Sequence, residues 1–89
     1  MGYTKHCLRR MSQRGIKMEH IDLVMRFGQN QGDKIVLNRK MIKYIISQRR
    51  FSHLKSKLLK LMDKGGVIAV CENSSIITTY NVNSYKRVR

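Results

Sequence analysis

The sequence predicts an α+β domain in which helices pack on a small twisted antiparallel sheet. Apolar residues recur at helical spacing through much of the chain, and two β-branched runs near its end, Val67 to Cys71 and Ile76 to Tyr80, are typical of strands. The length of 89 residues leaves room for one hydrophobic core. We therefore expect one domain over 1–89, with a core in 3–82, a basic tail in 83–89 and the order α-α-β-α-α-β-β.

Two amphipathic helices are predicted at the start of the chain, over 3–14 and about 18–27. Gly15 and Gly28 are typical of helix ends, whereas Lys17 is a poor residue for a helix start. The first helix divides into an apolar arc and a basic arc, so we expect it to bury one face and present charge on the other. The apolar residues of the two segments are Cys7, Leu8, Met11, Ile21, Val24 and Met25.

A short strand, a second helical region and a hairpin complete the predicted fold. The strand is expected at Lys34 to Leu37, and helical spacing then runs from Met41 to Met62. A break near Ser47 to Ser52 leaves open whether this region forms two helices or one bent helix. Gly65 and Gly66 close it, and the two β-branched runs that follow form the hairpin.

The charge of the chain is its strongest functional signal. There are 19 Lys and Arg residues against 5 Asp and Glu residues, which gives a formal net charge of +14. Solubility needs a net charge of magnitude only about 2–8 in a small domain. We therefore expect an anionic partner. Nucleic acid, and RNA above all, is favoured because neutralised phosphates release condensed counterions; an acidic protein and an anionic membrane surface are the alternatives.

Other sequence signals argue against secretion, membrane insertion and cofactor binding. The first residues contain no continuous apolar run of the kind found in signal peptides, and the longest apolar run, Val67 to Cys71, is too short to span a membrane. Cys7 and Cys71 lie within apolar patterns and are expected to be reduced thiols. Neither zinc-ligand spacing nor a Gly-rich phosphate-binding motif occurs. We expect a cytoplasmic protein with no membrane partner, no metal and no cofactor.

Two motifs suggest a family. The first helix carries His6-x3-Arg10-Met11-x2-Arg14-Gly15-Ile16, and the end of the chain carries Val67-Ile-Ala-Val-Cys-Glu-Asn and then Ile76-Ile77-Thr78-x-Tyr80. Over residues 3–80 this combination resembles a bacterial family of domains of unknown function, which occur as small stand-alone proteins and as parts of toxin systems. That family is remotely similar to the RelE-like and BrnT-like ribonuclease toxins, which share a fold with barnase-type nucleases.

The resemblance implies a RelE/barnase-like fold with helices on a twisted antiparallel sheet. In the ribonuclease members it also implies metal-independent RNA cleavage and an acidic antitoxin as partner. The sequence departs from the family pattern at two positions: Lys17 stands where a capping residue is usual, and no Arg follows Tyr80 directly. The second departure removes a basic residue that would serve catalysis on the last strand.

Three residues of the first helix are candidates for RNA chemistry. His6, Arg10 and Arg14 are spaced at i, i+4 and i+8, so they share one stripe, which we place opposite the apolar arc. RNA cleavage by 2′-OH attack needs a proton acceptor that titrates near neutral pH, which histidine provides, and positive charge for the phosphorane oxygens, which arginine provides. The same stripe also describes an ordinary solvated helix face.

Two residues of the last strand complete the candidate catalytic set. Thr78 and Tyr80 are expected to point to one side of the strand, with Thr79 opposite and Ile76 on the same side as Thr78. The hydroxyl groups can bind phosphate and the Tyr80 ring can stack on a base. Both residue types are also common in strands that have no such role.

The residues predicted to bind nucleic acid extend beyond this set. A basic amphipathic stretch between Arg39 and Lys64 can follow an RNA backbone, lie in a partner's groove, or form the solvated rim of a core helix pair. The function therefore has two readings: an RNA-binding domain, with or without cleavage, and a non-catalytic module or inhibitor that docks on an acidic protein or nucleoprotein complex. Oligomeric state is not predicted. The predicted nucleic-acid contacts are Arg9, Arg10, Arg14, Arg49, Arg50, Lys55 and Arg87.

Overall fold

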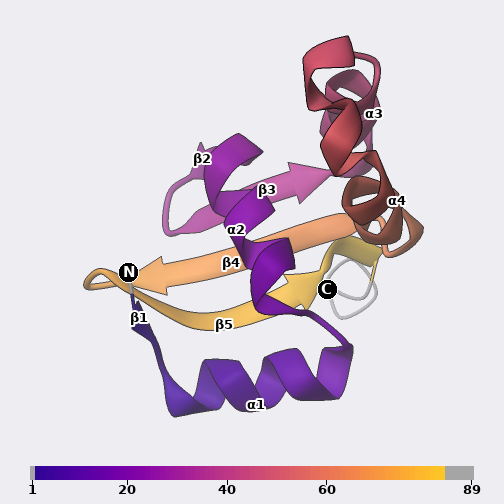
Figure 1. Ribbon diagram of the computed structural model, residues 1–89. Helices are drawn as coiled ribbons and strands as arrows, with labels where there is room; N and C mark the ends of the chain where they lie inside the picture. The colour runs from indigo at the N-terminus through magenta and orange to yellow at the C-terminus, as the bar shows by residue number, and fades with distance from the viewer. Residues whose placement is uncertain (1, 84–89) are drawn as a thin grey trace.

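Residues 2–83 are described in a computed structural model as a mixed five-stranded sheet with four α-helices (Figure 1). The strands lie in the order β1-β5-β4-β3-β2. Neighbouring strands are antiparallel apart from β1 and β5, which run parallel. The strands are β1 (Gly2–Tyr3), β2 (Gln29–Gln31), β3 (Lys34–Asn38), β4 (Gly66–Glu72) and β5 (Ser75–Asn81). The helices are α1 (Lys5–Arg14), α2 (Met18–Phe27), α3 (Arg39–Ile46) and α4 (Lys55–Asp63), with the 3-10 helix η1 (Arg49–Leu54) before α4.

The α+β class is confirmed, but the predicted order α-α-β-α-α-β-β and the purely antiparallel sheet are wrong. Two short strands were missed. β1 has two residues and pairs only with the start of β5, while β2 reads Gln-Asn-Gln and is exposed throughout. Neither segment shows the alternation of apolar and polar residues that reveals a strand. Between α3 and α4 the chain forms two helices joined by η1, which settles the ambiguous break.

The ends of α1 and α2 follow from local hydrogen bonds. The hydroxyl oxygen of Thr4 accepts a bond from the amide of Cys7 at 3.1 Å, and Gly15, with φ of 65°, closes α1 in the left-handed region. Lys17 makes no side-chain cap to α2. Instead, Nδ1 of His20 accepts a bond from the Lys17 amide at 3.1 Å. The weak start expected at Lys17 is therefore compensated by a histidine three residues later.

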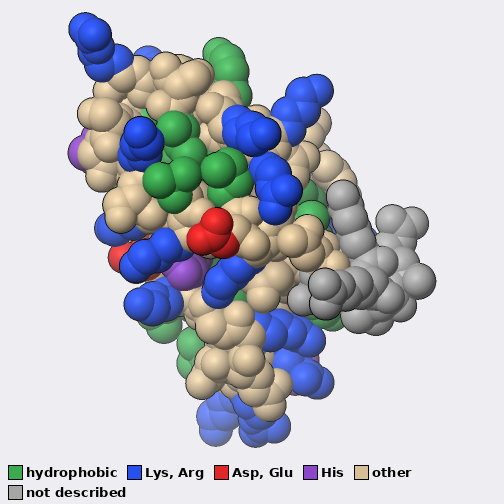
Figure 2. Space-filling view, turned by 90° about the vertical axis from the view of Figure 1, so that its right-hand side faces the viewer, with side chains coloured by type: hydrophobic (Ala, Val, Ile, Leu, Met, Phe, Trp, Pro, Cys, Tyr) green, Lys and Arg blue, Asp and Glu red, His purple; other side chains and the backbone are tan. Residues whose placement is uncertain are grey.

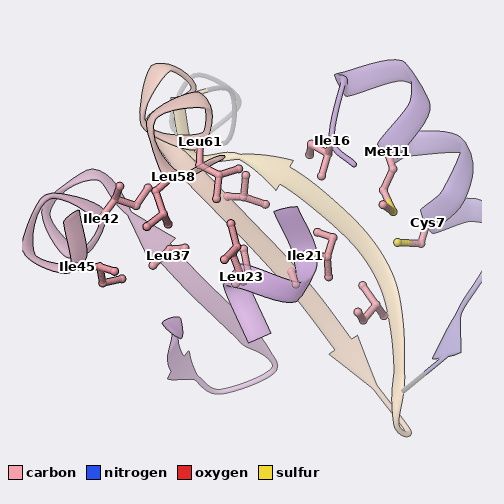
Figure 3. Close-up of a cluster of buried hydrophobic side chains, with 14 residues drawn as sticks. Cys7, Met11, Ile16, Ile21, Leu23, Leu37, Ile42, Ile45, Leu58 and Leu61 are labelled. Atoms are coloured by element: carbon pink, nitrogen blue, oxygen red, sulfur yellow. The ribbon is translucent and has the colours of Figure 1, made fainter. Parts of the chain in front are cut away.

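The main core lies between the helices and one face of the sheet. In Figure 3 the labelled helix side chains point toward the strands from several directions. All four helices contribute buried residues. Each fully buried Val, Leu, Ile or Met side chain stabilises the fold by about 1.5–3 kcal/mol. The buried members are Cys7, Met11, Ile16, Ile21, Leu23, Val24, Leu37, Ile42, Ile45, Leu58, Leu61, Val67, Ala69 and Ile76.

A second, smaller apolar cluster lies on the opposite face of the sheet. Ile68, Val70 and Val82 are buried there, with Val36, Ile77 and Tyr80 packed against them. Within residues 2–83, none of the four helices adds an apolar side chain to this cluster. The sheet thus has one helix-covered face and one face formed by strand side chains. No helix in the described part of the chain is long and apolar enough to cross a membrane.

Candidate nucleic-acid interface

Helix α1 lies alongside β5 and runs in the same direction (Figure 1). Near the start of the helix, the Thr4 hydroxyl donates to the Ile77 carbonyl at 3.3 Å. Near its end, Nδ2 of Asn81 donates to the Arg14 carbonyl at 3.3 Å. Because the helix is fixed to β5 at both ends, residues along α1 keep a constant relation to residues along the strand.

The side chain of Arg14 contacts two residues of β5. Its Nη1 donates to the Thr79 carbonyl at 2.7 Å, and its guanidinium carbon lies 4.6 Å from the centre of the Tyr80 ring. Both side chains are half-buried. A guanidinium at this distance from a ring face is attracted by the ring's quadrupole, so the two side chains hold each other in place.

The placement of Arg14 opposite the apolar arc is wrong. Arg14 follows Cys7 by seven residues, which is close to two helical turns, so the two residues lie on the same side of α1. Cys7 is fully buried against the sheet. Arg14 is consequently directed along β5 rather than away from it.

Thr78 and Tyr80 lie on the sheet face that carries the second cluster. In the register of β4 and β5, Thr78 is opposite Val70 and Tyr80 is opposite Ile68, while the buried Thr79 is opposite Ala69 on the helix-covered face. This arrangement confirms the expected alternation of these three residues. It contradicts the side expected for Ile76, because a bulge beside Ile77 shifts the register and sets Ile76 opposite Cys71 in the main core.

The other two residues of the stripe lie one and two turns before Arg14. Arg10 is half-buried and its Nη1 donates to Oε1 of Gln13 at 3.2 Å, while His6 is exposed. Residues four apart differ by about 40° around the helix axis, so the stripe turns gradually from Arg14, which contacts β5, to the exposed His6. The structure therefore brings Arg14 and Tyr80 into contact, sets Thr78 on the same face, and leaves His6 and Arg10 along the flank.

Thr78 has a further property that suits a binding surface. Its hydroxyl oxygen is buried and has no hydrogen-bond partner among the described residues. A buried hydroxyl without a partner costs free energy, so a phosphate or sugar oxygen that reaches it after a small local movement gains a hydrogen bond. Thr79 and Asn81 also carry unsatisfied side-chain oxygens, but Thr79 faces the helix-covered side.

Two lysines that are not among the predicted nucleic-acid contacts also belong to this region. Lys34 lies opposite Val70 in the pairing of β3 with β4, so it belongs to the same face as Thr78 and Tyr80. Nζ of Lys64 donates to the Gly15 carbonyl and stabilises the negative end of α1. The position of Lys34 follows from strand register, and that of Lys64 from a contact between the end of α4 and the end of α1. Residue spacing in the sequence shows neither.

The remaining predicted contacts do not join this site. Arg49, Arg50 and Lys55 are exposed on η1 and at the start of α4, near the opposite end of the molecule from α1 (Figure 1). Arg9 is exposed on α1, and Arg87 lies outside the described residues. Figure 2 shows Lys and Arg side chains from the top of the molecule to the bottom, with few acidic ones between them. Positive charge is therefore general, and the contact of Arg14 with Tyr80 is what distinguishes the α1–β5 edge.

Comparison with family profiles, with curated proteins and with solved structures finds no match for the chain. Within residues 2–83, no group of three or more His, Cys, Asp or Glu side chains is placed to hold a metal ion. The chemistry that this geometry offers consists of guanidinium and ammonium groups, an aromatic ring, hydroxyl groups and one exposed imidazole.

Proposed function

We propose that this protein binds RNA along the edge formed by α1 and β5. The observation that carries the proposal is the Arg14 guanidinium, held between the Thr79 carbonyl and the Tyr80 ring at the end of a basic stripe. A guanidinium has five N–H donors, and the bond to Thr79 uses one of them. The others remain suited to phosphate oxygens, which arginine binds through two parallel hydrogen bonds.

The neighbouring sheet face suits single-stranded rather than duplex RNA. Recognition of single strands combines a positive track for the backbone with aromatic or guanidinium surfaces on which bases stack. Here His6, Arg10 and Arg14 form the track, and Arg14 and Tyr80 bring a guanidinium and an aromatic ring together at the sheet face that carries Thr78. Successive residues of the stripe are four positions apart, which is about 6 Å along the helix axis.

The same stripe supports a finer proposal, that the protein is a cytoplasmic relative of the RelE-like toxins and cleaves RNA without a metal. In that reaction His6 accepts the 2′-OH proton while the 2′-oxygen bonds to phosphorus, and Arg10 and Arg14 stabilise the charge on the phosphorane. The bond from phosphorus to the 5′-oxygen then breaks, which leaves a cyclic phosphate, and the 5′-oxygen takes up a proton from water. The motif from His6 to Ile16 and the packing of helices on one sheet face support the kinship. The non-catalytic alternative uses the same arginines and lacks product formation.

RNA binding is tested by replacing one arginine on α1 and, as a control, one arginine far from α1. Arg10→Ala removes a charge from the stripe, and Arg49→Ala removes one from the far end of the molecule. With a fluorescein-labelled single-stranded RNA, we expect Arg10→Ala to weaken binding about tenfold and Arg49→Ala less than about twofold, as judged by anisotropy. Equal losses of affinity in the two variants would show that RNA binding depends on net charge alone. Unchanged affinity in Arg10→Ala would show that the stripe does not contact RNA.

Cleavage is tested in the same preparation. The protein is incubated in EDTA with 5′-labelled RNA, beside His6→Ala. Fragments that end in a cyclic phosphate and disappear in His6→Ala support the ribonuclease reading. Intact RNA that shifts in a gel with the unaltered protein supports a binding module without catalysis.

A further inference from the structure

A second surface feature lies away from α1 and is not used by the proposed RNA site. A pocket of about 490 Å³ opens between α3 and η1, beside the end of α2. A pocket of this size falls within the range of ligand-binding cavities, about 300–1,000 Å³. Its apolar lining comes from Phe27, Met41, Tyr44, Ile45 and Phe51.

The aromatic wall of the pocket is held in place. The rings of Phe27 and Phe51 meet edge to face, with centroids 5.0 Å apart and an interplanar angle of 81°. The guanidinium of Arg26 lies 4.9 Å from the Phe27 ring, and that of Arg50 lies 4.8 Å from the Phe51 ring. Such contacts fix the wall and keep two cations beside it before any partner arrives.

The rim of the pocket is cationic and its charge is not compensated locally. Lys40 and Arg50 line it, with Gln48 as a further polar residue. Arg26 lies against the same rings. None of the acidic residues of the chain, which are Glu19, Asp22, Asp33, Asp63 and Glu72, lines the pocket.

An apolar floor inside a cationic rim fits one chemistry in particular. We propose that the pocket is a docking site for an acidic amphipathic segment of a partner protein, whose apolar side chains enter the pocket while its carboxylates pair with Lys40 and Arg50. Apolar burial supplies the affinity, and the charged rim supplies selectivity and a fast encounter. Tyr44, which is 69% exposed, gains the most apolar contact when the segment is bound.

The same lining disfavours a nucleotide. A base buried here would leave donors and acceptors of its edge against Met41 and Ile45, because the polar groups of the lining side chains are limited to the Gln48 amide, the Tyr44 hydroxyl and the charged rim. Leaving such groups unpaired costs about 1–3 kcal/mol each. An aliphatic or aromatic side chain carries no such cost, so RNA is the less suitable occupant.

The test uses synthetic peptides as probes. A fluorescein-labelled peptide with Phe and Leu at i and i+4 and Glu at the flanking positions is titrated with the whole protein. A second peptide replaces Phe and Leu with Ser, and a third replaces Glu with Gln. We expect the first to bind at least about tenfold more tightly than either control, because only it satisfies both the floor and the rim.

Protein variants then locate the binding. Lys40→Gln/Arg50→Gln and Lys5→Gln/Arg9→Gln lower the net charge equally, the first at the pocket and the second on α1. We expect about a tenfold loss for the first pair and less than about twofold for the second. Tyr44→Ala, at an exposed position, should weaken the peptide several-fold while the thermal midpoint stays near that of the unaltered protein.

Three results would overturn the proposal. The Ser-substituted peptide binds as tightly as the parent, or both charge pairs lose the same affinity, in which case charge alone is responsible. Alternatively, a single-stranded RNA displaces the peptide and loses affinity in Tyr44→Ala, in which case the pocket takes RNA. The direct peptide titrations contain no RNA, so they test the pocket whether or not RNA binds along α1.

Discussion

The guanidinium of Arg14 donates to the Thr79 carbonyl at 2.7 Å and lies over the Tyr80 ring, 4.6 Å from its centre. A free arginine side chain loses rotamer freedom when it binds a phosphate, and this entropy loss weakens binding. Arg14 has already lost most of that freedom within the folded protein. Its contribution to RNA affinity should therefore exceed that of an exposed arginine such as Arg9, although both carry the same charge.

A buried histidine gives the protein a pH-dependent stability. His20 is 3% exposed, its Nδ1 accepts from the Lys17 amide, and its Nε2 has no hydrogen-bond partner among the described residues. Burial, followed by the positive charge of Lys64, lowers the pKa of His20 below its ordinary value of 6.5. Protonation of His20 therefore favours the unfolded state. The stability that neutral His20 gives the folded protein is fully present above pH 6.5 and is lost as the pH falls below this value.

We expect the free energy of unfolding, measured by urea titration, to decrease between pH 7.5 and pH 5 in the unaltered protein. His20→Gln keeps an acceptor near the Lys17 amide but does not titrate, so its stability should be lower at pH 7.5 and nearly constant over this range. The ion pair of Glu19 with Lys57 lowers the pKa of Glu19 and acts at more acidic pH. An unchanged slope in His20→Gln would assign the effect to another group.

At the scale of elements, the junction of α4 with β4 depends on a glycine. Gly66 has φ of 103°, and a Cβ at this position would overlap the carbonyl oxygen of Leu37 in the neighbouring strand. Gly32, in the turn between β2 and β3, also has positive φ, at 69°, but a Cβ there would meet no atom within 4 Å.

Replacing each of these glycines with Ala separates backbone strain from overlap. Gly32→Ala should cost about 1 kcal/mol, the penalty of the left-handed region alone. Gly66→Ala should cost more than about 3 kcal/mol, because β3 and β4 must also separate. The midpoint of urea unfolding measures both changes. Similar losses of stability in the two variants would mean that β3 and β4 accommodate a Cβ at position 66 without a further free-energy penalty.

The helices could be predicted because their sequence periodicity is strong, whereas the finer placement of side chains could not. Helical spacing identified α1 through α4, and the alternation of Thr78, Thr79 and Tyr80 was recovered from β-period alone. Ile76 was assigned to the wrong face because the bulge beside Ile77 leaves no trace in residue type. β2 was missed because its three residues are polar and exposed, so its pairing depends on backbone hydrogen bonds alone.

In the candidate site, too, features that depend on neighbouring residues could be predicted, whereas contacts between distant parts of the sequence could not. The stripe of His6, Arg10 and Arg14 follows from helical spacing. The contact of Arg14 with Tyr80 spans sixty-six positions of the sequence and requires α1 to lie along β5, which no local pattern reveals. The pocket beside Phe51 was not predicted either, since it depends on the angle that η1 introduces between α3 and α4.

At the scale of the whole molecule, the net charge of +14 includes the basic residues of both proposed binding surfaces, which differ in the groups that lie beside the charge. On α1 the charge lies beside a hydroxyl and a stacked aromatic ring, whereas at the pocket it surrounds an apolar floor. RNA carries condensed counterions that are released on binding, but a short acidic peptide carries few. Salt should therefore weaken the two interactions to different degrees.

For single-stranded RNA, the logarithm of the binding constant falls with the logarithm of salt by about 0.7 for each phosphate neutralised. If Arg10, Arg14 and Lys34 each neutralise one phosphate, the slope is about −2, and Arg10→Ala should reduce its magnitude by about 0.7. The acidic peptide should show a shallower slope, because apolar contacts supply most of its affinity. Anisotropy titrations at several NaCl concentrations measure both slopes. Equal slopes for the two ligands would indicate that both respond to the same diffuse charge, and the distinction between the α1–β5 edge and the pocket would then have no electrostatic basis.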